Sequence, residues 1–144
     1  MLAIVTTVMS LRKNAKIELL RGVPLFERCS ARELGEIAAV ADELGVPAGK
    51  VLAAEGERGR EFVVLVEGAA EVRRKGRRIN TLAAGDFLGE IALVTDRPRT
   101  ATVTTTGPAR VLVLTGRDFQ RLLERVPSLA VKVLAALGER LPAD

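Results

Sequence analysis

Between residues 43 and 115 the chain consists of short apolar or β-branched runs separated by glycines. Runs of this length and composition favour β-strands, and glycine supplies the turns between them. The runs that we expect to be strands are Val51–Leu52, Phe62–Val66, Ala70–Val72, Ile79–Leu82, Thr100–Thr106 and Val111–Leu114. Lys75 and Gly76 predict a hairpin turn between the third and fourth of these. Many short strands joined by glycine turns indicate an antiparallel β-barrel or jelly roll.

Helical patterns precede this β region. Residues 11–21 predict a short helix that ends at Gly22. Ser30 and Glu33 have the spacing of a capping box, and apolar residues follow them at helical spacing. We therefore expect an amphipathic helix over residues 31–42.

Helical patterns also follow the β region. Thr115 and Asp118 predict a helix cap, and the helix after them carries apolar residues on one face. We expect Pro127 to break this helix and Ser128 to cap a second one that continues to Pro142. Helices at both ends of a β region give an α+β class: a barrel or jelly roll flanked by an N-terminal helical bundle and C-terminal helices.

The residue types that are present restrict the chemistry. The 144-residue sequence has no histidine, and Cys29 is its sole cysteine. A zinc site, a serine–histidine catalytic set and an internal disulfide cannot be built from these residues. We therefore expect no metal site, no catalytic residues and no enzyme. A single cysteine also fits a reducing cytoplasm. The length predicts one domain, which we assign to residues 13–144 after an N-terminal extension over residues 1–12.

The first ten residues are apolar but lack the features of a targeting segment. No basic residue precedes the apolar run, and the run is too short to span a bilayer. It is a frayed end, an element that packs on a partner subunit, or a misassigned start with Met9 as the first residue. We accordingly expect a cytoplasmic protein without a membrane span.

One stretch has a pattern that suits an anion. Gly85 and Gly89 permit backbone conformations that a side chain would forbid. Residues 90–93 can form one turn of helix, whose first N–H groups have no partner inside it and favour an anion. Arg99 follows after a loop long enough to fold back, and its guanidinium could contact the same anion with two N–H groups. Glu90 is unusual beside an anion unless its carboxylate accepts hydrogen bonds from hydroxyls. A phosphate next to a ribose hydroxyl would provide both the anion and the donor.

The same stretch resembles the phosphate-binding cassette of the cyclic nucleotide-binding domain family. Gly89–Leu93 matches the family's Gly-Glu-(Leu/Ile)-Ala-Leu, and Pro98–Thr102 matches its Pro-Arg-small-Ala-Thr. Two matching blocks at the right separation are a much more specific signal than a lone glycine motif. The resemblance covers roughly residues 13–141 and implies the family's double-stranded β-helix, with an N-terminal bundle that moves when ligand binds. Residues 85–102 are called the cassette below.

The resemblance implies a role for each central cassette residue. The backbone amides from Gly89 through Ile91 to Ala92 would hold the cyclic phosphate of the ligand. Arg99 would neutralise that phosphate, and Glu90 would accept a hydrogen bond from the ribose 2′-hydroxyl.

The base of the ligand would meet less specific residues. Val72 and Leu82 are candidate apolar walls against a purine, and they suit the core of the β region equally well. The chain has no tyrosine or tryptophan to cover the base, so the final helix would have to supply a lid. Arg140 could stack on a purine by a cation–π interaction, although a solvated arginine at a helix end is the commoner case. Thr100 could reach a phosphate oxygen or the exocyclic amine of guanine, and it does not decide between cAMP and cGMP.

The resemblance as a whole implies a cytoplasmic receptor module for a cyclic nucleotide, with cAMP favoured over cGMP and no other cofactor. It would signal by moving its terminal helices, and a protein partner or a second copy in a homodimer would respond. Only Pro142–Asp144 follow the last helix, so we expect no DNA-binding domain. The alternative is a degenerate member that keeps the fold as a protein interaction scaffold without a physiological nucleotide.

The segment Arg73–Arg78 concentrates basic residues around Gly76. A charged hairpin tip is the common explanation for such a cluster, and contact with nucleic acid or anionic lipid is the alternative. The formal net charge of +4 suits an anionic ligand without requiring nucleic acid.

Overall fold

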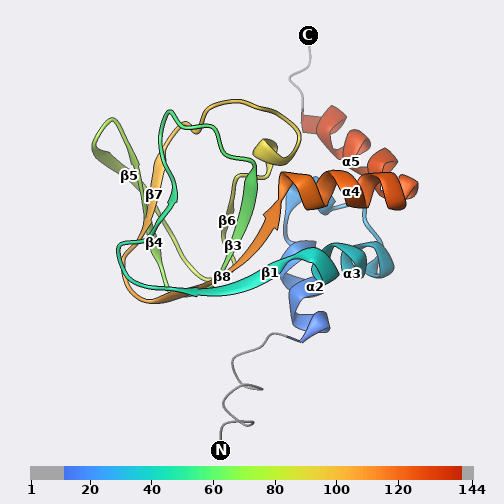
Figure 1. Ribbon diagram of the computed structural model, residues 1–144, viewed down its shortest axis with the longest axis horizontal. Coiled ribbons are helices and arrows are strands. Elements are labelled where there is room, and N and C mark those ends of the chain that lie inside the picture. Colours follow the sequence, from blue (N-terminus) through green and yellow to red (C-terminus); the bar gives the residue numbers. More distant parts are fainter. Residues whose placement is uncertain (1–11, 141–144) are drawn as a thin grey trace, which may run out of the picture.

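The computed structural model describes residues 12–140, and for Arg140 the backbone alone. Figure 1 shows the helices gathered on one side of the molecule and the strands on the other. The N-terminal extension that we assign to residues 1–12 lies, apart from Arg12, outside the described residues, as does the choice between Met1 and Met9 as the start.

Over residues 12–140 the strands form two antiparallel sheets of four strands each. The first contains, in spatial order, β1 (Asp42–Val46), β8 (Ala109–Thr115), β3 (Glu61–Glu67) and β6 (Phe87–Leu88). The second contains β2 (Val51–Ala53), β7 (Thr102–Thr105), β4 (Ala70–Arg74) and β5 (Arg77–Leu82). Strands far apart in sequence are neighbours, as in the pair β1 and β8. The predicted α+β class and jelly-roll arrangement are confirmed, although the sheets form a sandwich and not a closed barrel.

β3 is buried on both faces because it lies between the helices and the second sheet. Successive side chains of a strand point to opposite faces. Phe62 and Val64 accordingly belong to the core beneath the helices, whereas Val63 and Leu65 belong to the core between the sheets. This double burial explains why the run Phe62–Val66 within β3 is apolar at every position.

The helical layer packs on the first sheet through aromatic and aliphatic side chains. It comprises α2 (Lys13–Arg21), the 3₁₀ turn η1 (Pro24–Phe26), α3 (Ala31–Val40), α4 (Gly116–Arg125) and α5 (Pro127–Arg140). Phe26 of η1 meets Phe62 of β3 edge-on, with ring centroids 5.9 Å apart. Leu129 of α5 is fully buried in the same core. Burial of each such side chain contributes roughly 1.5–3 kcal/mol, which holds the helices on the sheet. In the described part of the chain, no helix combines the length and the apolar character needed to cross a membrane.

α3 begins with the capping box that the sequence predicts. The Glu33 N–H donates to Ser30 Oγ at 3.2 Å, and the Ser30 N–H donates to Glu33 Oε1 at 2.8 Å. The Glu33 carboxylate also reaches α5, because Ser128 Oγ donates to its Oε2 at 2.9 Å and Lys132 Nζ donates to its Oε1. One buried carboxylate therefore joins α3 to α5.

The helix expected over residues 31–42 is shorter, and the strand after it was not predicted. α3 ends at Val40, and Asp42–Val46 form β1. Aspartate, glutamate and glycine are depleted in strands, so this segment carries little β signal of its own. Its strand is stabilised by pairing with β8, far along the chain.

Two boundaries near the other helices also differ from the predictions. Pro127 separates α4 from α5 but is the first residue of α5, where its fixed φ and missing N–H are tolerated. Ser128 therefore lies inside α5 and does not cap it. β7 begins at Thr102 and not at Thr100, because the preceding residues belong to the cassette loop.

The predicted hairpin turn joins β4 to β5. Lys75 and Gly76 have positive φ values of 52° and 78°, as a two-residue turn of type I′ requires. Arg73 pairs across the hairpin with Arg78, and the exposed tip is basic, as expected.

Candidate ligand-binding site

The cassette begins with a turn that leads into β6. Gly85 and Gly89 have φ values of 95° and 81°, a region that strains any residue with a side chain. Asp86 Oδ2 accepts a hydrogen bond from the Ala83 N–H at 2.8 Å, so Asp86 stabilises the turn. β6 itself pairs with β3. The first half of the cassette is therefore anchored to the first sheet.

After Gly89 the chain forms η2 (Ile91–Leu93), a 3₁₀ turn at the place of the expected helical turn. The Ala92 N–H donates to the Gly89 carbonyl at 3.0 Å, and the Leu93 N–H donates to the Glu90 carbonyl at 3.2 Å. The Ala92 N–H, which we expected to face a phosphate, is thus engaged inside the turn. The Ile91 N–H lies before these bonds in the chain. Like the first N–H groups of any helical turn, it has no acceptor within the turn.

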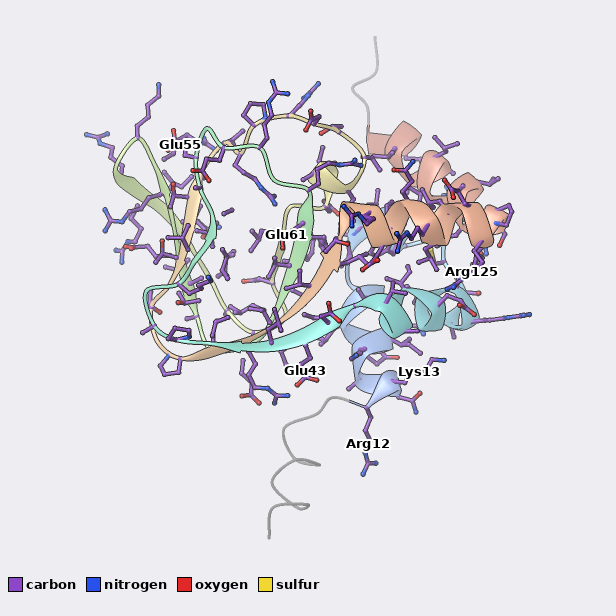
Figure 2. All side chains as sticks on the ribbon, in the orientation of Figure 1. Arg12, Lys13, Glu43, Glu55, Glu61 and Arg125 are labelled. Atoms are coloured by element: carbon purple, nitrogen blue, oxygen red, sulfur yellow. The ribbon has the colours of Figure 1, made fainter. Side chains whose placement is uncertain are left out.

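Arg99 is held beside Gly89 by the loop between β2 and β3. Its N–H donates to the Glu57 carbonyl at 2.9 Å, and its carbonyl accepts from the Gly56 N–H at 2.8 Å. Its guanidinium donates through Nη2 to the carbonyl of Glu61, the first residue of β3, at 2.7 Å. Figure 2 labels Glu61 on this strand. Backbone and side chain of Arg99 are therefore both held by hydrogen bonds to neighbouring segments.

The close approach of Arg99 requires glycine at position 89. A Cβ at this position would lie 2.4 Å from Arg99 Nη1 and 2.4 Å from the Glu61 carbonyl oxygen. Burial lowers the pKa of Arg99, and the Glu61 carboxylate opposes this effect. Arginine does not lose its proton in proteins, so a partly buried cation faces the turn.

Arg99 lines three cavities, and two of them are also lined by Gly89 and Thr100. The first of these two has a volume of about 410 Å³ and is lined by cassette residues 87–92, 95 and 97–100. The second has a volume of about 280 Å³ and lies between the cassette and the second sheet. Residues outside the shared part that line this second cavity are Ala53, Val72, Arg74, Ile79, Asn80, Leu82, Ala101 and Val103. Within residues 12–140, no group of three or more His, Cys, Asp or Glu side chains is arranged to hold a metal.

The structure brings together the predicted site residues whose side chains it describes. The first cavity is lined by Gly89, Glu90, Ile91, Ala92, Arg99 and Thr100. Val72 and Leu82 line the second cavity and also pack against the core between the sheets; their contact with a purine stays a prediction. Arg140 ends α5, but its side chain and Leu141 lie outside the described residues, and the lid stays a prediction.

Glu90 connects the cassette to the helical layer. Its side chain is buried, and Oε2 accepts a hydrogen bond from the Leu25 N–H of η1 at 3.4 Å. A carboxylate in this position can accept from a ligand hydroxyl only in competition with, or in addition to, this N–H. Its contact with a ribose stays a prediction.

Two polar side chains of the second cavity, Arg74 and Asn80, are not predicted from the sequence. Arg74 follows Val72 by two residues on β4, so it points to the same face, and its Nε donates to the Thr100 carbonyl at 3.1 Å. Asn80 lies opposite Val72 in the register of β4 and β5. The two-residue period from Val72 could have identified Arg74, whereas Asn80 required knowledge of the register.

The sequence matches a known family of domains. The family model described as the cyclic nucleotide-binding domain matches residues 43–126. A cAMP-dependent protein kinase regulatory subunit of Mycosarcoma maydis is 39% identical, over 78% of this chain and 23% of that protein. A cyclic nucleotide-gated potassium channel of Rhizobium etli is 35% identical, over 85% of this chain and 34% of that protein. The chain therefore spans only a quarter to a third of the length of these relatives.

Solved structures have the same fold. The N-terminal domain of a transcriptional regulator from Streptomyces coelicolor A3(2) superposes with a TM-score of 0.77 at 30% identity, covering 85% of this chain and 91% of that one. A cyclic nucleotide-binding-like protein from Brucella abortus gives a TM-score of 0.71 at 27% identity, with 76% and 98% covered. A structure described as cAMP-bound PfPKA-R gives a TM-score of 0.66 at 28% identity, with 88% and 47% covered.

Proposed function

This chain belongs to the cyclic nucleotide-binding domain family, and on that premise we propose that it is a receptor for a cyclic nucleotide that prefers cAMP to cGMP. Relatives named as kinase regulatory subunits contain such a domain in a regulatory protein. We propose a regulatory role for this chain as well: it binds the nucleotide without chemical conversion and transmits its occupancy to a partner.

The position of Arg99 is the observation that carries this proposal. Its guanidinium stands where these cavities meet, beside the backbone of Gly89. A hydrogen bond to the Glu61 carbonyl of β3 holds the guanidinium, and backbone hydrogen bonds to the β2–β3 loop hold the main chain. A cation fixed in advance avoids the entropy cost of ordering a long side chain on binding. This arrangement supports an anionic group at the junction, with the rest of the ligand in the adjoining cavities.

A cyclic nucleotide has parts that match both cavities. The phosphate would lie in the first cavity against Arg99, where the Ile91 N–H is also available from the turn. The ribose hydroxyl would approach Glu90, which lines the same cavity. The purine would occupy the second cavity, where Val72 and Leu82 supply apolar surface.

The preference for cAMP rests on the relatives more than on the cavity. The kinase subunit of Mycosarcoma maydis is named for cAMP, and the structure described as PfPKA-R was solved with cAMP. Thr100 is exposed at the junction of the cavities, and its hydroxyl suits a phosphate oxygen or a guanine amine equally. The choice between adenine and guanine is therefore tested by measuring the affinities for cAMP and for cGMP.

The contact between Glu90 and Leu25 suggests how occupancy would reach the helices. A ribose hydroxyl that donates to Oε2 of Glu90 competes with the Leu25 N–H for that oxygen. Weakening that bond would loosen η1, which packs against α5. Occupancy would thereby shift the population between two arrangements of the terminal helices, to be sensed by a protein partner or a second copy of the chain.

The test is isothermal titration of the refolded, ligand-free protein with cAMP and with cGMP. We expect one-to-one binding, tighter for cAMP. Arg99→Ala should weaken binding by roughly tenfold to a hundredfold, because a charged hydrogen bond contributes about 1.5–3 kcal/mol. Arg78→Ala is the matched control, since Arg78 lies at the exposed hairpin and lines neither of these two cavities; its affinity should equal that of the unchanged protein.

The same titration separates the proposal from its alternative. A folded sample that binds neither nucleotide would contradict receptor function and favour the interaction scaffold. Unchanged affinity in Arg99→Ala would contradict the role given to Arg99 even if the protein binds nucleotide.

A further inference from the structure

Arg60 directly precedes β3, and its side chain reaches across to the cassette. Its guanidinium donates through Nη2 to the Leu93 carbonyl at 2.9 Å and through Nε to the Ala92 carbonyl at 3.4 Å. These carbonyls belong to the end of η2, on the far side of the turn from Gly89. One arginine therefore bonds two consecutive residues of the turn that faces the first cavity.

A turn as short as η2 depends on such outside contacts. The last carbonyls of a helix have no partner within it, and a cation near them is favourable because they carry partial negative charge. A single turn is also unstable on its own, since few hydrogen bonds offset the ordering of its backbone. The guanidinium of Arg60 presents donors on separate nitrogens in one fixed plane, a geometry that the three donors on the single nitrogen of a lysine do not reproduce.

The main chain of Arg60 is attached to α4. The Gly116 N–H, at the first residue of α4, donates to the Arg60 carbonyl at 2.6 Å. A Cβ at Gly116 would lie 3.0 Å from Arg60 Cβ and 3.1 Å from its Nε. The absence of a side chain at Gly116 is therefore what lets Arg60 lie against the start of α4.

We propose that Arg60 is a positioning residue for anion recognition: it holds η2 from its far end, keeps the Gly89 turn beside Arg99, and links the turn to the first turn of α4. The inference rests on the proposed function and adds to it a residue that does not touch the nucleotide. Because Arg60 bonds η2 through its side chain and α4 through its carbonyl, it also provides a direct path between the cassette and α4.

The test compares the cAMP affinity of four folded variants by titration. Arg60→Ala should bind about tenfold more weakly, because both carbonyl contacts are lost. Arg60→Lys keeps the charge but not the planar pair of donors, and it should remain at least about threefold weaker. Gly116→Ala pushes on Arg60 from α4 and should weaken binding in the same direction. Arg117→Ala, an exposed arginine in the first turn of α4, is the control and should bind as the unchanged protein does.

Two further readouts distinguish positioning from a general effect on charge or stability. If Arg60 acts through the turn beside Arg99, Arg60→Ala should weaken cAMP binding less in a protein that already carries Arg99→Ala. If the two residues act independently, their losses of binding free energy should add. In the ligand-free protein, hydrogen exchange of the N–H groups of Leu93, Val94 and Thr95, which donate within the turn, should be faster in Arg60→Ala than in Arg117→Ala.

The outcomes can be separated from those of the proposed function. If the unchanged protein binds neither nucleotide, the proposed function fails, and the exchange rates alone decide whether Arg60 holds the turn. If the unchanged protein binds but Arg60→Ala binds equally well, the positioning role is wrong. Full affinity in Arg60→Lys would show that charge alone acts, and it would overturn the two-carbonyl contact as the cause.

Discussion

Replacement of Gly89 by alanine tests the geometry of the cassette directly. Gly89 has a φ of 81°, and a Cβ there would lie 2.4 Å from both Arg99 Nη1 and the Glu61 carbonyl oxygen. The guanidinium can move away, but the carbonyl belongs to β3, which is paired with β8 at this residue. The clash must therefore be relieved by movement of the cassette itself.

The cost of Gly89→Ala has two parts. A left-handed backbone with a side chain costs about 1–2 kcal/mol, and forcing extra volume into a packed site costs about 1–3 kcal/mol. Gly85→Ala is the matched control, because Gly85 has a φ of 95° but nothing within 4 Å of its Cβ position. We expect Gly85→Ala to lose only the first part, and Gly89→Ala to lose about 2–5 kcal/mol in total.

Unfolding in urea and titration with cAMP measure both consequences. Gly89→Ala should unfold at a lower urea concentration than Gly85→Ala. In thermal unfolding, its melting temperature should be lower by roughly 2–4 °C for each kcal/mol of difference in the free energy of unfolding. It should also bind cAMP at least about tenfold more weakly, because Arg99 is displaced. Equal unfolding free energies for the two variants would refute the close approach on which the site rests.

Two predictions concern titrating groups in the helical layer. Burial raises the pKa of Glu33, but hydrogen bonds with Lys132, Ser30 and Ser128 outweigh it and lower the pKa to about 2. A carboxylate whose pKa is lower in the folded state contributes its full stabilisation of the fold above its unfolded pKa. It loses that contribution as the pH falls toward its folded pKa. Between pH 6 and pH 3, the free energy of unfolding should therefore fall by about 2 kcal/mol more in the unchanged protein than in Glu33→Gln, measured by urea denaturation; parallel curves would contradict this. Burial and the Glu33 carboxylate raise the pKa of Cys29 to about 11, against the opposing effect of Lys132. A disulfide reagent at pH 8 should thus react with the folded protein roughly a hundredfold more slowly than with the urea-unfolded chain, and similar rates would show that the thiol is accessible.

Local signals in the sequence are sufficient for much of this fold. The capping box at Ser30 and Glu33 and the turn at Lys75 and Gly76 involve residues close in the chain, and both are confirmed. β1 could not be predicted in this way, because its composition is unfavourable for a strand and its order comes from pairing with β8. The strand is a consequence of the tertiary structure and not of its own residues.

The candidate site divides in the same manner. Gly89 and Arg99 are recognisable because both belong to one short motif whose spacing is visible in the sequence. Arg60 could not be assigned to the site, since its contact with Leu93 arises only when distant segments fold together. The spacing from Val72 could have identified Arg74, but its contact with the Thr100 carbonyl likewise arises only in the folded structure. Sequence reasoning therefore finds the residues that would touch the phosphate and misses those that support them.

The burial of β3 on both faces has a consequence for how the molecule folds and fails. The two cores have a common wall, because Phe62 and Val64 complete one while Val63 and Leu65 complete the other. Both cores also include side chains of β8, which pairs with β3 from far along the chain, so completing either core requires closure of a long loop. The helices and the sandwich should consequently melt in one transition, and damage to either layer lowers the resistance of the whole domain to unfolding and proteolysis.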